Sequence, residues 1–230
     1  MNEDQPDAKL RMEIVRGAQA LVDAGVLSGT QHGNWSVRVP GTDRILLTGS
    51  SLGGVRPEDL AVLTLDGEVV HGGLSASSAE IIRMHTAVYL ERSDVGSVVH
   101  THSPYSSAFA VANRPLECYA EILARMGSAD PIPVAAYGPR GSDESIGNIV
   151  RAMRQAPAQN AVLLGNHGIL AFGPDVGTAR QMVFALEETA QLAILASAIG
   201  TPQAIPPTMV MAAQQRRAAF EATGTVTANS

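Results

Sequence analysis

The chain has 230 residues, of which 45% are hydrophobic and 17% charged, and this balance predicts one folded domain over residues 1–230. A net charge of −6 without a basic run excludes nucleic acid and anionic membrane surfaces as partners, and no apolar run reaches the roughly 18 residues that span a bilayer. The polar N-terminus and the single cysteine, Cys118, favour a cytoplasmic protein and exclude an internal disulfide or a metal site built from cysteines.

Apolar periodicity and turn residues predict the elements in the first half of the chain. The expected order is a helix at 8–26, strands at 35–39 and 44–47, a hairpin of 61–65 and 68–70, a helix at about 79–92 and a strand at 95–100. The run at 95–100 is apolar almost throughout and ends in polar residues, so we expect a buried strand that delivers its end to a site.

The second half continues the alternation of helices and strands. Expected are helices at 104–113 and 116–126, a strand at 132–135, a helix at 143–156, two strands within 160–172 and a long helix at 176–199. Residues from about 202 onward have weak helical content and predict a mobile C-terminal tail. The mixture of meandering strands and layered helices predicts an α/β fold, a three-layer α/β/α sandwich with a mostly antiparallel central sheet.

Three histidines lie where apolar strands end. His100 ends the strand at 95–100, His102 follows it by two residues, and His167 lies in the turn between the two strands of 160–172. Alternate residues of a strand share a face, so His100 and His102 can present two imidazoles side by side. Three imidazoles with an open fourth position are typical of a catalytic zinc site. Because the only lysine, Lys9, lies in the polar N-terminal segment, Schiff-base chemistry is excluded and a metal is the expected stabiliser of any carbanion.

Other polar residues near this pattern are candidates for binding and proton transfer. Glu80 opens the predicted helix before the first histidine strand, where a carboxylate either simply favours the helix N-terminus or acts as a metal ligand and base. Loops rich in Ser, Thr, Gly and Asn, at 29–34, 48–51 and 77–78, could hold an anion through neutral donors, although such loops are mostly just turns.

The remaining histidines are assigned more modest roles. His85 follows Glu80 by five residues, which turns it to a different face of the helix and favours a structural role. His32 lies in the loop 29–34 and could touch substrate, whereas His71 follows a hairpin strand and is expected at the surface.

Five segments in this order resemble the class II aldolase/adducin family: GNWSVR (33–38), LTGSS (47–51), SSAE (77–80), DVGSVVHTHSP (94–104) and GNHGILAFG (165–173). The resemblance spans roughly residues 8–200. It implies one divalent cation per subunit, Zn²⁺ first and Mn²⁺, Co²⁺ or Fe²⁺ as alternatives, on His100, His102, His167 and Glu80. It implies phosphate contacts at Thr30, Asn34, Ser50, Ser51, Ser77 and Ser78.

The resemblance also implies a homotetramer with active sites at subunit interfaces, where a neighbouring chain supplies an acid/base group. Glu121 and Tyr119 are the two candidates for that group. Three departures from the family pattern stand out, one of which is that the C-terminal tail carries no tyrosine and has Phe220 as its only aromatic residue. The loop 29–34 is one residue longer than usual, and SSAE places Glu80 one residue further from His100.

The implied chemistry is that of a metal-dependent aldehyde-lyase, which cleaves a ketose 1-phosphate such as L-fuculose 1-phosphate into dihydroxyacetone phosphate and an aldehyde. Alternatives on the same scaffold are a 4-epimerase of pentulose 5-phosphates, a dehydratase of methylthioribulose 1-phosphate and a metal-dependent decarboxylase. A non-catalytic interaction module of the adducin type is a further alternative, against which the presence of all three histidines argues.

Overall fold

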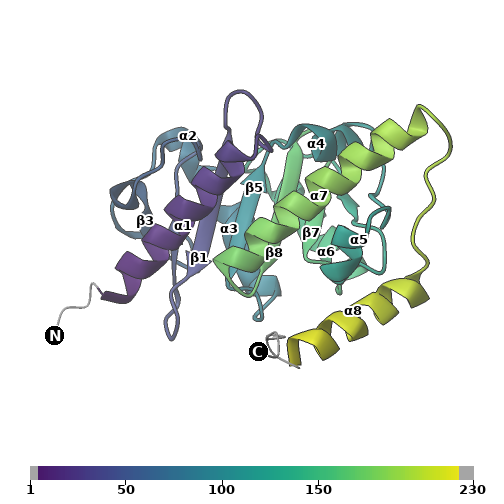
Figure 1. The fold of residues 1–230 in the computed structure, drawn as a ribbon. Helices are drawn as coiled ribbons and strands as arrows, with labels where there is room; N and C mark the ends of the chain where they lie inside the picture. The colour runs from purple at the N-terminus through teal and green to yellow at the C-terminus, as the bar shows by residue number, and fades with distance from the viewer. Residues whose placement is uncertain (1–4, 223–230) are drawn as a thin grey trace.

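Figure 1 shows a computed structural model of the chain, which describes residues 5–222 and their side chains except those of 5, 6, 77, 221 and 222. Eight strands in this part form one sheet in the order β4-β3-β2-β1-β5-β8-β7-β6. The strands are β1 Gly33–Arg38, β2 Arg44–Leu47, β3 Ala61–Thr64, β4 Val69–His71, β5 Ser97–Thr101, β6 Val134–Ala135, β7 Ala161–Leu164 and β8 Gly168–Gly173. All neighbours pair antiparallel except β6 and β7, which confirms the predicted mostly antiparallel sheet.

Helices cover both faces of the sheet, so the predicted three layers are confirmed (Figure 1). The helices are α1 Gln5–Asp23, α2 Ala76–Ala79, α3 Ile82–Glu91, α4 Pro104–Val111, α5 Glu121–Arg125, α6 Asp143–Gln155, α7 Val176–Ser197 and α8 Pro207–Ala222, with a short 3₁₀ turn at Pro57–Asp59. One core lies between the sheet and α1, α4, α5 and α7, and a second lies between the opposite face and α3 and α6. No described helix is long and apolar enough to cross a bilayer.

Trp35 fastens α1 to β1 at the centre of the first core. Its side chain is fully buried, which removes roughly 150–250 Å² of a large aromatic residue from water. Gly17 of α1 leaves room for it, because a Cβ there would stand 2.6 Å from the indole ring. The indole N–H donates to the Ser97 hydroxyl at 2.8 Å, so the buried donor is satisfied. This packing fixes β1 and therefore the loop that precedes it.

The predicted helix at 79–92 is interrupted in the structure. Ser75 caps α2 by accepting a hydrogen bond from the Ser78 N–H, and α2 ends at Ala79. α3 begins at Ile82, and its orientation is set by the side chains that it buries. The helical hydrogen bonding is therefore interrupted at residues 80–81, which include Glu80.

Two other elements differ from the sequence prediction. The helix expected at 116–126 is reduced to α5, because Leu116 is fully buried in an isolated bridge to Ile132. The segment from about 202 contains the 16-residue helix α8, although its amino-acid sequence favours a helix only weakly. Val210 of α8 is fully buried in the first core, and such tertiary packing stabilises a helix that propensity alone would not. Residues 223–230 of the predicted tail lie outside the described part, and its mobility stays a prediction.

Candidate metal centre and active site

The three predicted histidines converge at one end of the central strands. The ring centroids of His100 and His102 are 5.0 Å apart, and His167 lies 4.7 Å from the first and 4.9 Å from the second. β5 carries His100 and ends one residue before His102, while His167 immediately precedes β8. The antiparallel pairing of β5 with β8 therefore brings together side chains that are 65 or more residues apart in sequence.

The backbone of the turn before β8 is shaped for this approach. Asn166 adopts a positive φ of 56°, a conformation that asparagine tolerates better than most residues. Gly168 then passes close to β5, where a Cβ would stand 2.5 Å from the Thr101 carbonyl oxygen and 2.9 Å from the His102 ring. The Asn-His-Gly sequence thus allows the imidazole of His167 to reach the other two.

A fourth imidazole joins the cluster from the loop before β1. The His32 ring centroid lies 4.6 Å from that of His102 and 6.5 Å from that of His100. One nitrogen from each of these three rings falls in a group whose members are all within 4.8 Å of one another, an arrangement that could hold a metal ion. The sequence had suggested His32 only as a possible substrate contact.

The imidazoles are neutral at physiological pH. Burial lowers the pKa of His100 well below its usual value, and burial with the neighbouring imidazoles lowers that of His102 to about 4. Burial and the Arg140 charge lower the pKa values of His167 and His32 as well. His100 donates from Nδ1 to the Ile169 carbonyl oxygen at 2.8 Å, which leaves the Nε2 lone pair free to bind a cation.

The donor set fits a divalent cation. The Nε2 atoms of His100 and His102 are 3.2 Å apart. Two nitrogens each about 2.0–2.1 Å from one tetrahedral cation would be roughly 3.3 Å apart. Neutral imidazoles favour zinc and related transition metals over magnesium or calcium. The described residues therefore provide a suitable site for the cation that the sequence predicts.

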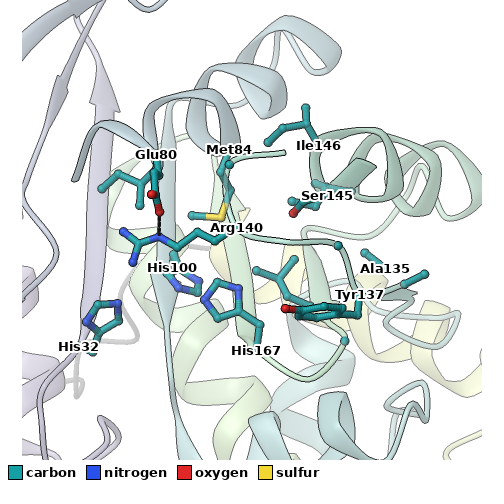
Figure 2. Close-up of a pocket in the computed structure, with 17 residues that line it drawn as sticks. His32, Glu80, Met84, His100, Ala135, Tyr137, Arg140, Ser145, Ile146 and His167 are labelled. Carbon is teal, nitrogen blue, oxygen red and sulfur yellow. Dashed lines mark ion pairs between the residues drawn. The ribbon is translucent and has the colours of Figure 1, made fainter. Parts of the chain in front are cut away.

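His32, His100 and His167 line a recess that opens at the surface (Figure 2). Glu80 also lines it, and its carboxylate forms an ion pair with Arg140 at 3.2 Å. The Glu80 side chain is 51% exposed, and neither Glu80 nor His167 belongs to the group of three histidines whose ligand atoms lie within 4.8 Å of one another. The structure thus brings Glu80 to the site and engages it with Arg140.

Sequence reasoning missed Arg140 and Tyr137 in this recess. Both belong to the loop after β6, a segment for which the sequence predicts no role. The sequence Tyr-Gly-Pro-Arg-Gly does place an arginine between two turn-forming glycines, and this was the available signal. Its position beside the histidines depends on the parallel pairing of β6 with β7 and could not be read locally.

The predicted phosphate-binding residues are not all in one place. Ser50, Ser51 and Ser78 line a second recess, and Ser51 is bridged to His32, which connects the two sites. Ser77 lies in α2, but its side chain is outside the described part of the structure. Thr30 is exposed on the preceding loop, where its hydroxyl is 3.0 Å from that of Ser28.

Asn34 is buried on β1 and takes part in a chain of hydrogen bonds with α3. Its Oδ1 accepts from His85 Nε2 at 2.5 Å, and His85 Nδ1 accepts from the Ser36 hydroxyl at 2.7 Å. The Ser36 oxygen is in turn 2.8 Å from the hydroxyl of Tyr89. Burial lowers the pKa of His85 to about 3, so this histidine is neutral. The structure therefore assigns His85 a structural position, while the Asn34 amide nitrogen has no partner among the described residues.

The two candidates for a group supplied by a neighbouring chain lie away from the histidine recess of their own chain. Glu121 is exposed at the first turn of α5, and Tyr119 packs partly against the first core beside α4 and α7. His71 is exposed on β4, as expected.

Comparison with known proteins agrees with this geometry. Residues 12–194 match the family model of the class II aldolase and adducin N-terminal domain. The 5-deoxy-D-ribulose 1-phosphate aldolase of Bacillus thuringiensis is 32% identical over 200 residues, which cover 86% of this chain and 90% of that protein. A 5-methylthioribulose-1-phosphate/5-deoxyribulose-1-phosphate aldolase of Rhodospirillum rubrum is 33% identical over 199 residues, 86% of each chain. A solved structure of L-fuculose 1-phosphate aldolase superposes with a TM-score of 0.81 at 26% identity, covering 92% of this chain and 97% of that one.

The chain belongs to the class II aldolase and adducin family. Within this family it is close to the L-fuculose-phosphate aldolases, and it is an aldolase of the lyase class. Class II aldolases are metal-dependent, and the histidine cluster described above could bind the metal.

Proposed function

We propose that this protein cleaves a ketose 1-phosphate into dihydroxyacetone phosphate and an aldehyde, with one divalent cation held by His100, His102 and His167. The observation that carries the proposal is the convergence of these neutral imidazoles, two of which line a recess that also contains Glu80. Three relatives, all aldolases of ketose 1-phosphates by name, support this class of substrate. Zn²⁺ is the expected ion, with Mn²⁺, Co²⁺ and Fe²⁺ as alternatives.

The proposed reaction breaks the C3–C4 bond of the ketose. When bound, the cation supplies Lewis-acid stabilisation of the negative charge that develops on the substrate oxygens. The C4 hydroxyl gives up its proton, the electrons of the C3–C4 bond remain on the dihydroxyacetone phosphate fragment, and C4 leaves as an aldehyde. Glu80 then delivers a proton to C3, and in the reverse direction removes it.

We assign the C4 hydroxyl proton to a group from a neighbouring subunit of a homotetramer. Tyr119 and Glu121 remain the two candidates, and their position away from the histidine recess of their own chain supports a role across an interface. Serines 50, 51, 77 and 78, with Asn34 and Thr30, are proposed to bind the phosphate through neutral donors. The recess lined by Ser50, Ser51 and Ser78 supports this assignment for those three residues.

A substrate panel tests the proposed reaction. Purified protein is incubated with L-fuculose 1-phosphate, 5-deoxyribulose 1-phosphate and a pentulose 5-phosphate, and dihydroxyacetone phosphate is measured with a coupled dehydrogenase. We expect its release from at least one ketose 1-phosphate. Interconversion of pentulose 5-phosphates without any free aldehyde would replace the aldolase by the 4-epimerase.

The role of Glu80 is tested by hydrogen exchange. Glu80→Gln should slow exchange of the C3 hydrogen of dihydroxyacetone phosphate with solvent by at least about 100-fold, because the carboxylate that moves this proton is lost. Glu68→Gln, at an exposed position in the β3–β4 hairpin, is the matched control and should exchange normally. Normal exchange in Glu80→Gln would exclude Glu80 as the base.

A further inference from the structure

The candidate metal centre contains one more imidazole than the family pattern requires. His32, His100 and His102 form one group of potential ligands, and His167 lies beside two of them, with ring centroids 4.7 Å from that of His100 and 4.9 Å from that of His102. His100 and His102 are neighbours of both His32 and His167, and their Nε2 atoms are 3.2 Å apart. A cation bound by His100 and His102 would therefore have His32 on one side and His167 on the other.

The backbone holds His32 in this position. The preceding residue, Gln31, adopts a positive φ of 51°, which is unusual for a residue other than glycine and is kept only where neighbouring structure enforces it. The Gln31 carbonyl accepts from the Leu52 N–H at 3.1 Å, and its side chain packs closely on Gly53. His32 itself is bridged to Ser51, and the next residue, Gly33, pairs with Thr101 at the end of β5. The additional residue in the loop is thus accommodated by a defined turn that directs His32 toward the cluster.

The His32 ring has no competing partner. Neither of its nitrogens hydrogen-bonds to another protein group in the part of the chain that the structure describes. Its nitrogen lies at most 4.8 Å from those of His100 and His102, compared with roughly 3.3 Å in a tetrahedral site, so the ring needs only to turn slightly toward a bound cation.

Glu80, the residue that the family pattern would place in this position, is engaged elsewhere. Its carboxylate is paired with Arg140, and Figure 2 shows the guanidinium end of Arg140 between Glu80 and the labelled imidazoles. To reach the cation, Glu80 would have to leave a charged partner and pass a second positive charge. His32 faces no such obstacle.

We propose that His32 is a ligand of the cation in the resting enzyme and takes the place that Glu80 would otherwise fill. This inference rests on the proposed metal-dependent function but not on the identity of the substrate. A neutral imidazole in place of a carboxylate leaves the full charge of the cation uncompensated. It also leaves Glu80 uncoordinated in the recess wall, where it can serve in proton transfer.

The test is the ligand environment of the metal-loaded protein without substrate. X-ray absorption of the zinc-loaded wild type should be fitted by four imidazoles, and that of His32→Gln by three. Zinc affinity, measured by competition with a chromophoric chelator, should fall at least about tenfold in His32→Gln, because removing a ligand costs at least as much as removing a residue that supports one. Glu80→Gln should keep four imidazoles and nearly unchanged affinity. His71→Gln, an exposed histidine on β4, is the matched control.

Different failures have different meanings. Three imidazoles plus an oxygen ligand in the wild type, with affinity lost in Glu80→Gln but not in His32→Gln, would overturn the role of His32 and leave the proposed function standing. A wild type that binds zinc no better than His100→Ala would overturn both. Unchanged far-ultraviolet circular dichroism establishes that the variants fold, and the imidazole count of the wild type needs no variant.

Discussion

Replacing His85 by glutamine should remove a large part of the acid sensitivity of folding. His85 is fully buried between β1 and α3, and burial lowers its pKa to about 3 from its usual value of 6.5. The folded protein therefore keeps this ring neutral between these two pH values, whereas the unfolded chain protonates it. The stability contributed by the neutral ring is present above pH 6.5 and is lost as the pH falls through this window.

The expected magnitude follows from this difference. Each pH unit below 6.5 lowers the contribution of His85 to the free energy of unfolding by about 1.4 kcal/mol. This contribution is therefore about 2 kcal/mol smaller at pH 5.0 than at pH 7.5. Glutamine can replace the donor to Asn34 and the acceptor for Ser36 but does not titrate. The other histidines titrate in both proteins, and their contributions cancel in the difference.

Urea unfolding followed by circular dichroism at the two pH values measures this effect. The stability advantage of the wild type over His85→Gln should shrink by about 2 kcal/mol at pH 5.0. A difference that stays constant within about 0.5 kcal/mol would show that His85 is not held as a buried neutral ring, and the hydrogen-bond chain from Asn34 to Tyr89 would have to be revised.

Two further predictions concern how the scaffold holds the site. The Glu187 carboxylate on α7 accepts from the backbone N–H groups of residues 105 and 106 and from the Ser106 hydroxyl at 2.7–2.8 Å, so Glu187→Ala should lower the free energy of unfolding by about 3 kcal/mol in urea. The exposed Glu188→Ala is its control, and an equal loss there would contradict the role of this contact. Gly168→Ala should weaken zinc binding at least about tenfold, because the added Cβ meets the Thr101 carbonyl and the His102 ring, whereas Gly147→Ala, which meets open space, should not. Equal zinc affinity in both variants would show that the close approach at Gly168 is dispensable.

The sequence predicts the sheet well because its strands are locally marked. The strand at 44–47 is observed with the same bounds, and the hairpin turn lies at residues 65–66, one residue before the expected position. Local patterns also place the two histidine segments at strand ends. Their meeting could be anticipated only from the family resemblance, because it depends on the pairing of β5 with β8.

The features that the sequence does not reveal depend on contacts between distant segments. The break at residues 80–81 reflects two helices with separate constraints, and α8 depends on burial of Val210. His32 and Arg140 enter the recess from loops whose positions are set by the bridge to Ser51 and by the pairing of β6 with β7. Hydrophobic periodicity carries no information on either loop.

Metal-dependent release of dihydroxyacetone phosphate tests the central claim most directly. The protein is stripped with a chelator, its metal content is measured, and turnover of the best ketose 1-phosphate is followed before and after one equivalent of Zn²⁺, Mn²⁺, Co²⁺ or Fe²⁺ is restored. We predict that turnover disappears with the metal and returns with at least one of these ions, but not in His100→Ala or His167→Ala. Full turnover by the stripped protein, or by either variant without bound metal, would contradict the account.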